Sequence, residues 1–483
     1  MSSDKTLQLG EPADEADWRA LVEQGLKGAA WSRLVGKTAD GIPLEPLYRE
    51  PNMHTAEDVS GMPGAAPFVR GARVGAWRIR QAFAHPDPAR TNDDILADLK
   101  GGVGAIELVI DPDGRRGVAI RDENDLDVAL ADVILEAAPV SLDAGEHGAW
   151  EADLLRTKLR GVAAPGTAFN LDPVGAYMRG GDKLCAEEHA FALEFTARHA
   201  AELPAAKFLR ADARIVHEAG GTEAQEIAIA LACGIHYLRA MQAQPVSAEQ
   251  TASVLSFAVS VGPDVLVETA KLRALRLCWA RVLEASGVAP EKRSAHIHAF
   301  SSRRMMTRYD AWTNILRVSA AAFAAAVGGA DDITTYPLTD ALGLPTPFSR
   351  RVARNTQHVL LEECRLDHVA DPAGGAWFVE KLTRDLAAKA WEIMQAIETR
   401  GGVVAALNDG YLQTLVSDAR TLRQRAFATR RETITGVTDF PQLGAAAPDF
   451  VARAAAQDVG ALAPVRWAAP FEALRDRAEA GKP

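Results

Sequence analysis

Two histidines separated by one residue, His296 and His298, are the first candidates for chemistry. They fall in an apolar run, residues 295–300, that we predict to be a β-strand, so both side chains point to the same side of it. Inside a barrel, such a pair could bind a metal ion. Only His358 and His368 follow it as further histidine ligands. We therefore favour packed or pocket-lining histidines over a metal site.

A group of arginines follows the same predicted strand: Arg303, Arg304, Arg308 and Arg317. The C-terminal ends of barrel strands are where active sites form, and guanidinium groups there could bind phosphates or carboxylates. A structural cluster paired with acidic side chains is the alternative. The residue types alone leave both interpretations open.

Two loops resemble anion-binding motifs. The sequence Gly36-Lys37-Thr38 matches the end of a phosphate loop, but Trp31 stands where the first glycine of that motif belongs. We therefore do not expect a nucleotide site there. The loop 371–375 (DPAGG) precedes a predicted helix, whose N-terminus could bind an anion, although ordinary turn chemistry explains the loop equally well.

The elements that position these residues alternate between short apolar runs and amphipathic helices from about residue 61 to 402. The predicted strands are 104–110, 139–142, 167–171, 208–216, 255–261, 295–300, 333–336 and 366–369. A helix is predicted from Thr222, where Thr222 and Gln225 form a T-x-x-Q capping box. Seven or eight strands alternating with helices indicate an α/β fold with a parallel sheet, and we predict a (β/α)8 TIM barrel.

The two ends of the chain have a different pattern. Residues 1–60 contain one predicted helix, 17–26, followed by turn-rich sequence with too few apolar positions for a core of their own. We expect an arm that packs on another surface. Residues 403–483 are rich in alanine and are predicted to form a helical tail around the barrel.

Composition excludes several classes of protein. The 483 residues carry a net charge of −11, which argues against nucleic-acid binding. The most apolar stretch, 318–330, is too short to span a membrane, and the acidic N-terminus is no signal peptide. Four widely spaced cysteines without a CxxC pair favour a reducing compartment, so we expect a cytoplasmic protein.

Several segments together resemble the cobalamin-dependent methylmalonyl-CoA mutase family. They are residues 31–48, 67–71, 217–226, 267–276, 310–317, 348–356 and 371–402. The resemblance implies a barrel that binds a CoA ester along its axis. It also implies a separate domain that holds adenosylcobalamin through the histidine of an Asp-x-His-x-x-Gly motif. The cofactor would start a radical 1,2-shift of the thioester carbonyl.

This chain departs from the family pattern at the cofactor motif. None of its 11 histidines has an aspartate two positions earlier. Residues 466–478 resemble the linker that leads into the cobalamin domain. We therefore expect no cofactor-binding motif in this chain and adenosylcobalamin to be held by a partner subunit.

It also departs at the catalytic pocket. Arg214 and Ile215 stand where catalytic members have Tyr-His, and isoleucine cannot donate a hydrogen bond to a carbonyl. Phe300 replaces a glutamine. The remaining positions of a vestigial pocket are His298, Ser301, Ser302 and Arg303, and the corrin-covering tyrosine is missing near residues 73–77. The run 302–310 resembles the family's small, non-catalytic subunit.

The resemblance therefore implies a small subunit of a heterodimeric mutase that interconverts methylmalonyl-CoA and succinyl-CoA. Its expected partner is the catalytic large subunit, with an acyl-CoA as a further ligand to be tested. The expected parts are an arm (1–60), a barrel (61–402) and a linker-like tail (403–483). One alternative is a catalytic barrel that works with a separately encoded cobalamin-binding subunit. Another is a metal-dependent hydrolase using His296 and His298.

Overall fold

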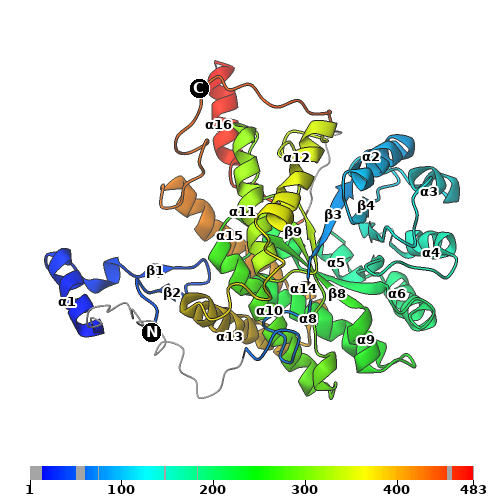
Figure 1. Cartoon of the computed structure of the whole chain (residues 1–483), viewed down its shortest axis with the longest axis horizontal. Helices are drawn as coiled ribbons and strands as arrows, with labels where there is room; N and C mark the ends of the chain where they lie inside the picture. Colours follow the sequence, from blue (N-terminus) through cyan, green and yellow to red (C-terminus); the bar gives the residue numbers. More distant parts are fainter. Residues whose placement is uncertain are drawn as a thin grey trace, which may run out of the picture.

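A computed structural model describes residues 14–49, 60–73, 75–145, 148–181, 183–453 and 460–481, and every structural statement below refers to them. Eight parallel strands close into a barrel in the order β10-β3-β4-β5-β6-β7-β8-β9 (Figure 1). The strands are β3 (Arg78–Phe83), β4 (Ala105–Val109), β5 (Val140–Asp143), β6 (Ala168–Leu171), β7 (Lys207–Asp212), β8 (Leu255–Val261), β9 (Ile297–Ser301) and β10 (Asp332–Thr334). This confirms the predicted (β/α)8 fold.

Three details of the strand prediction were wrong. β3 was missed because arginines Arg78 and Arg80 interrupt its apolar pattern. The predicted strand 208–216 ends at Asp212, and the residues after it begin the short helix α7 (Arg214–Glu218). Residues 366–369 form no strand but lie in turns that follow the π-helical segment η6 (Val359–Glu363).

Helices surround the barrel in the expected alternation. They are α2 (Pro88–Lys100), α3 (Glu123–Ala129), α4 (Gly148–Leu159), α5 (Pro173–Met178), α6 (Ala186–His199), α8 (Glu223–Met241), α9 (Ala248–Val254), α10 (Val265–Ala285), α11 (Asn314–Val327), α12 (Pro347–His358) and α13 (Trp377–Thr399). The capping box at the start of α8 is confirmed, because Thr222 and Gln225 each accept the other's backbone N–H. α8 and α10 are almost fully buried, since α13 packs across both.

The N-terminal arm stands out from the barrel (Figure 1). It consists of α1 (Glu15–Leu26), the short helix η1 (Trp31–Arg33) and the two-stranded sheet of β1 (Gly36–Lys37) and β2 (Pro43–Leu44). Thr38 closes this hairpin by hydrogen bonds with Ile42, so Gly36-Lys37-Thr38 is not a phosphate loop. Asp40 joins the arm to the barrel, because its carboxylate accepts hydrogen bonds from the Thr222 hydroxyl and the Ala224 N–H at the start of α8.

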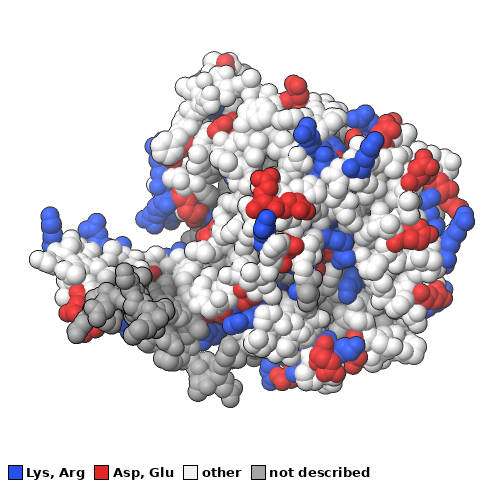
Figure 2. Space-filling model, in the orientation of Figure 1, with Lys and Arg blue, Asp and Glu red and all other residues white. Residues whose placement is uncertain are grey.

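The C-terminal part adds α14 (Val403–Asn408), α15 (Tyr411–Ala428) and α16 (Ala469–Glu479). Figure 2 shows a recess between the protruding arm and the body of the molecule, with basic side chains on both sides of it. None of the helices in the described ranges combines the length and the apolar character needed to cross a membrane.

Candidate functional site

The inside of the barrel is filled by paired charges. Arg80 donates to Asp332 over 2.9 Å. Arg210 reaches Asp143 over 2.9 Å, and these four side chains are largely buried. Buried ions are tolerated only when they are paired and hydrogen-bonded, and here each arginine has a carboxylate beside it. The space along the axis is therefore occupied by the chain's own ion pairs.

These pairs set the protonation of the buried carboxyls. Although burial opposes it, the Arg80 guanidinium holds the pKa of Asp332 well below its usual range. Burial raises the pKa of Glu107, which also lies inside the barrel, to about 7 despite the nearby Arg80. Both Glu107 oxygens lack a hydrogen-bond partner. The barrel thus holds an ionised Asp332 beside Arg80 and a glutamate, Glu107, whose pKa lies near 7.

A stack of cationic and aromatic side chains closes the C-terminal end of the barrel. Arg214 Cζ lies 4.0 Å from the centre of the Phe300 ring. Phe300 in turn packs on His298, with 3.8 Å between ring centres, and faces Tyr336 at 6.3 Å. Arg303 covers Tyr336, with its Cζ 3.9 Å from the ring centre. We refer to Arg214, Phe300, Tyr336 and Arg303 as the mouth stack.

The mouth stack leaves its inner members almost without solvent contact. Phe300 is 1% exposed, Tyr336 7% and Arg214 8%. Arg214 also donates to Asp212 over 2.8 Å and to Asp143 over 3.0 Å. Burial opposes ionisation, yet these two aspartates raise the pKa of Arg214 well above its usual value. Arg214 is therefore a charged side chain held in place by Asp143 and Asp212, at a position where the family resemblance predicts a tyrosine in catalytic members.

The two histidines of the H-x-H motif both point into the barrel, but they serve different partners. His296 Nε2 lies 2.9 Å from Asp332 Oδ2, near the N-terminal end of the strands. His298 Nε2 shares a hydrogen bond of 2.8 Å with Thr334 Oγ1. Burial, followed by the charge of Arg80, holds the pKa of His298 well below its usual range. In the described residues, no group of three or more potential ligands is arranged for a metal ion.

The other predicted pocket residues lie at the same end of the barrel. Ser301 Oγ accepts the Tyr336 N–H at 2.8 Å, and Arg303 pairs with Asp340 at 3.1 Å. Ile215 is buried in the hydrophobic core beside the mouth stack. The structure therefore brings together residues from 214–215 and 298–303, and it gives each polar one a partner within the chain.

Ser302, His217 and Glu226 have the hydrogen-bond order of a hydrolytic triad. His217 Nε2 lies 2.9 Å from Ser302 Oγ, and His217 Nδ1 lies 3.1 Å from Glu226 Oε2. All three residues are 0% exposed. Lys271 Nζ also donates to Glu226, over 2.8 Å. These buried hydrogen bonds join α7 and α8 to the residue that follows β9.

Sequence reasoning missed the charged members of this network. Glu226 and Lys271 lie in α8 and α10 close to other polar residues, Glu223 with Gln225 and Glu268 with Arg273, so the local pattern did not mark them as buried.

The arginine cluster after β9 is structural. Arg304 donates to the His217 and Gly221 carbonyls, both at 2.7 Å, and Arg308 pairs with Glu472 at 3.2 Å. Arg317 donates to Asn314 at 2.9 Å. At the 371–375 loop, the Gly375 N–H donates to Glu380 and Asp371 pairs with Arg273. Each of these groups is hydrogen-bonded to, or paired with, a residue of the same chain. This agrees with the alternative of a structural arginine cluster and an ordinary turn at residues 371–375.

The C-terminal segment lies over the loops at this end of the barrel. Val451 forms a β-bridge with Leu344. The Val465 N–H donates to the Glu218 carbonyl at 2.7 Å, and the Trp467 N–H donates to the Arg304 carbonyl at 3.0 Å. The tail is therefore anchored to loops that follow different strands of the barrel.

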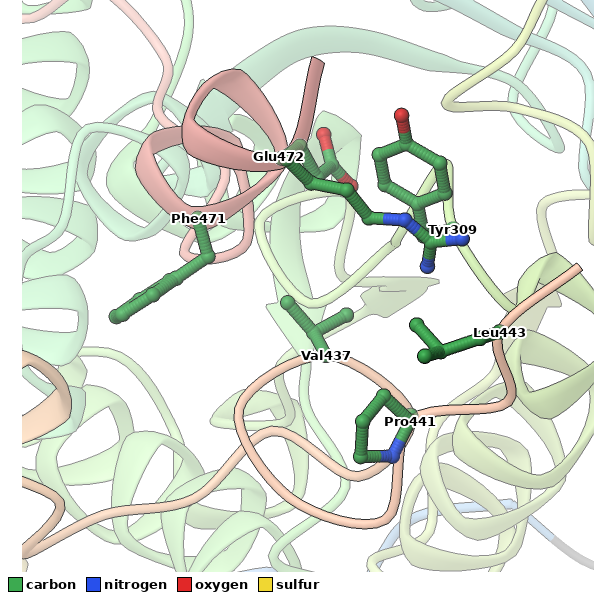
Figure 3. A pocket seen from close by; sticks show the side chains of 8 residues that line it. Tyr309, Val437, Pro441, Leu443, Phe471 and Glu472 are labelled. Atoms are coloured by element: carbon green, nitrogen blue, oxygen red, sulfur yellow. The ribbon is translucent and has the colours of Figure 1, made fainter. Parts of the chain in front are cut away.

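Helix α16 follows this anchor and closes a small hollow of about 170 Å³ against the 436–443 loop. The hollow is lined by Phe471 of α16, by Val437, Pro441 and Leu443 of the 436–443 loop, and by Tyr309 from the loop after β9 (Figure 3). The nearby carboxylate of Glu472 is 1% exposed and pairs with Arg466 at 2.7 Å. The hollow lies outside the barrel axis, so it adds no space at the mouth stack.

A family model described as methylmalonyl-CoA mutase matches residues 37–457. The chain belongs to the methylmalonyl-CoA mutase family. This confirms the resemblance read from the motifs and places the chain in a family of isomerases.

Three relatives are similar in sequence to this mutase-family chain over most of its length. It is 40% identical to a methylmalonyl-CoA mutase small subunit of Streptomyces virginiae, over 97% of this chain and 77% of the relative. It is 38% identical to the methylmalonyl-CoA mutase small subunit of Propionibacterium freudenreichii subsp. shermanii, over 96% and 74%. A methylmalonyl-CoA mutase of Cereibacter sphaeroides is 31% identical, over 88% and 64%.

Proposed function

We propose that this chain is the small, non-catalytic subunit of a heterodimeric, adenosylcobalamin-dependent methylmalonyl-CoA mutase. The complex would interconvert methylmalonyl-CoA and succinyl-CoA, and this chain would stabilise the catalytic large subunit. The small-subunit relatives at 37–40% identity support this proposal. The four cysteines, all free thiols, suit a cytoplasmic complex.

The single observation that carries the proposal is the mouth stack. An acyl-CoA that enters the barrel along its axis would have to displace Arg214 from Asp143 and Asp212 and move the buried Phe300 ring. Breaking a buried ion pair costs several kcal/mol, roughly 3–5 for loss of one partner. The pocket chemistry of a catalytic chain is also absent, because Ile215 cannot donate to a carbonyl oxygen.

The same end of the barrel does not fit a corrin. A cobalamin bound here would need an open face at the strand ends. Arg303 and Tyr336 cover that face, and the tail is anchored across it. We therefore propose that the partner subunit holds adenosylcobalamin.

The arm, residues 1–60 in the predicted division, is the proposed contact with that partner. α1 has no buried residue, and its apolar side chains Trp18, Leu21, Val22 and Leu26 recur at helical spacing. Leu21 is 68% exposed. Within the described residues α1 packs on Trp31 through Trp18, with 5.8 Å between the ring centres, and the exposed Leu21 beside that contact is suited to pack on another subunit. The recess beside the arm (Figure 2) offers space for part of the partner subunit.

The proposal is tested by purifying the full chain alone and together with a mutase large subunit. We expect a 1:1 complex by light scattering, and mutase activity in the complex but not in this chain supplied with adenosylcobalamin. Leu21→Asp should weaken the complex, whereas Ile134→Asp, at a similarly exposed position on the barrel, should not. Mutase activity of the isolated chain would contradict the non-catalytic role.

The alternative is a catalytic barrel that works with a separately encoded cobalamin-binding subunit. The mutase of Cereibacter sphaeroides shows that the family likeness extends to chains not named as small subunits. An assay with a free-standing cobalamin-binding subunit distinguishes the two proposals. Thioester rearrangement there would favour the alternative, and its absence would favour the small subunit.

A further inference from the structure

Two histidines outside the barrel face each other across neighbouring helices. His189 lies on α6 and His236 on α8, and their Nε2 atoms are 2.9 Å apart. The ring centres are 5.0 Å apart, with 61° between the ring planes. Both side chains are partly exposed. Neither residue belongs to the mouth stack or to the ion pairs inside the barrel.

The short distance constrains where the protons are. Two N–H groups cannot face each other at 2.9 Å, so at most one of the two Nε2 atoms carries a proton. At least one Nε2 therefore presents a lone pair toward the other ring. Burial also lowers the pKa of both imidazoles, to about 4 for His236.

The geometry points to a metal site, and we propose that His189 and His236 together bind a divalent first-row transition ion. Imidazole nitrogens lie about 2.1 Å from such an ion, so two of them in adjacent positions at a right angle are about 3 Å apart. The two Nε2 atoms already have this spacing. Binding needs the proton on one Nε2 to move to Nδ1 of the same ring, and both rings to turn so that their Nε2 lone pairs converge on the ion.

Water would complete the coordination sphere. No third histidine, cysteine or acidic side chain joins the pair among the residues that the structure describes. The nearby cation of Arg239 is paired with Glu398, which reduces its repulsion of an ion. Borderline ions that prefer imidazole are therefore expected in the order Cu²⁺ above Ni²⁺ and Zn²⁺, with Mn²⁺ weakest. A bound ion would join α6 to α8.

The test uses the full chain with Cys185 and Cys364 changed to serine, so that these accessible thiols cannot bind the ion. Titration with Ni²⁺ and with Cu²⁺, followed by calorimetry, should show one ion for each chain. His189→Gln and His236→Gln should each reduce the affinity at least 10-fold. The matched control is His199→Gln on the same helix, where His199 pairs with Glu202, and it should leave the affinity unchanged.

Thermal unfolding gives a second readout that does not depend on calorimetry. An ion that binds the folded chain raises the unfolding temperature, and this rise should disappear in the His189 and His236 variants alone. The unfolding temperature without metal shows that each variant is folded. Undetectable binding in the chain with Cys185 and Cys364 changed to serine, or equal affinity in the His189, His236 and His199 variants, would overturn the proposal.

Discussion

Arg214 and Phe300 are 86 positions apart in the sequence, yet the Arg214 guanidinium lies over the Phe300 ring, with 4.0 Å from Cζ to the ring centre. Both residues stand at positions where the family resemblance predicts other side chains in catalytic members. The two aspartates hold the guanidinium in place, and the guanidinium lies over the phenyl ring. The two predicted departures therefore form one contact.

This contact predicts coupled effects on stability. Arg214→Ala leaves Asp143 and Asp212 with fewer partners and should lower the free energy of unfolding by about 3–5 kcal/mol. Phe300→Ala should cost about 3–5 kcal/mol through the cavity it leaves. The double variant should lose about 1–2 kcal/mol less than the two single losses added together, because the shared cation–π contact is counted once. Urea unfolding of the parent, the two single variants and the double variant measures this double-mutant cycle. Strictly additive losses of stability would show that the cation–π contact contributes nothing.

Restoring the pocket residues of catalytic members should not restore activity. In the variant Arg214→Tyr with Ile215→His and Phe300→Gln, the tyrosine cannot neutralise Asp143 and Asp212. We expect a lower unfolding temperature and no binding of succinyl-CoA at millimolar concentration by calorimetry. The parent chain is the control and should also bind no succinyl-CoA. Tight binding by either chain would show that the axis is open.

Glu151 on α4 should make stability depend on pH. Its residue is 1% exposed and neither carboxyl oxygen has a hydrogen-bond partner. Burial, with a smaller contribution from Glu188, raises its pKa to about 8. Between the ordinary glutamate pKa near 4.5 and about 8, the folded chain holds a proton that the unfolded chain has lost. The contribution of Glu151 to stability therefore falls as the pH rises through that window.

Glu151→Gln removes this titration. We expect the variant to equal the parent at pH 4.5 and to be more stable by a few kcal/mol at pH 9, at roughly 1.4 kcal/mol for each pH unit. Chemical unfolding at several pH values measures the difference. Glu249→Gln, at an exposed position on α9, is the control, and its free energy of unfolding should depend on pH as that of the parent does. A constant difference between the Glu151 variant and the parent at all pH values would contradict this assignment.

Glu472 should hold α16 in place. Its carboxylate accepts the Arg308 N–H at 2.7 Å and pairs with Arg466 at 2.7 Å. Most other side chains of α16 are exposed or only partly buried. Glu472→Ala should therefore increase amide exchange in residues 469–479 at least 10-fold while the barrel keeps its unfolding midpoint. Glu479→Ala on the same helix is the control, and an equal effect there would show that Glu472 is not the anchor.

The sequence by itself determined the alternation of strands and helices and the family, and the replacement of the pocket residues stays a prediction. The strands, helices and family follow from local periodicity and from motifs that are contiguous in the chain. The same local reasoning failed at β3, where Arg78 and Arg80 hide an inward-facing strand, and at 366–369, where a short apolar run lies in turns.

Only the tertiary structure decided what each polar residue does. The spacing of His296 and His298 indicated that both face the barrel interior. Closure of the barrel placed His296 beside Asp332 and His298 beside Thr334. The pairing of His189 with His236 likewise depends on how α6 packs beside α8. Periodicity specifies the side of an element on which a residue lies. Burial and charge partners come from residues far along the chain, and these meet only when the helices and strands pack.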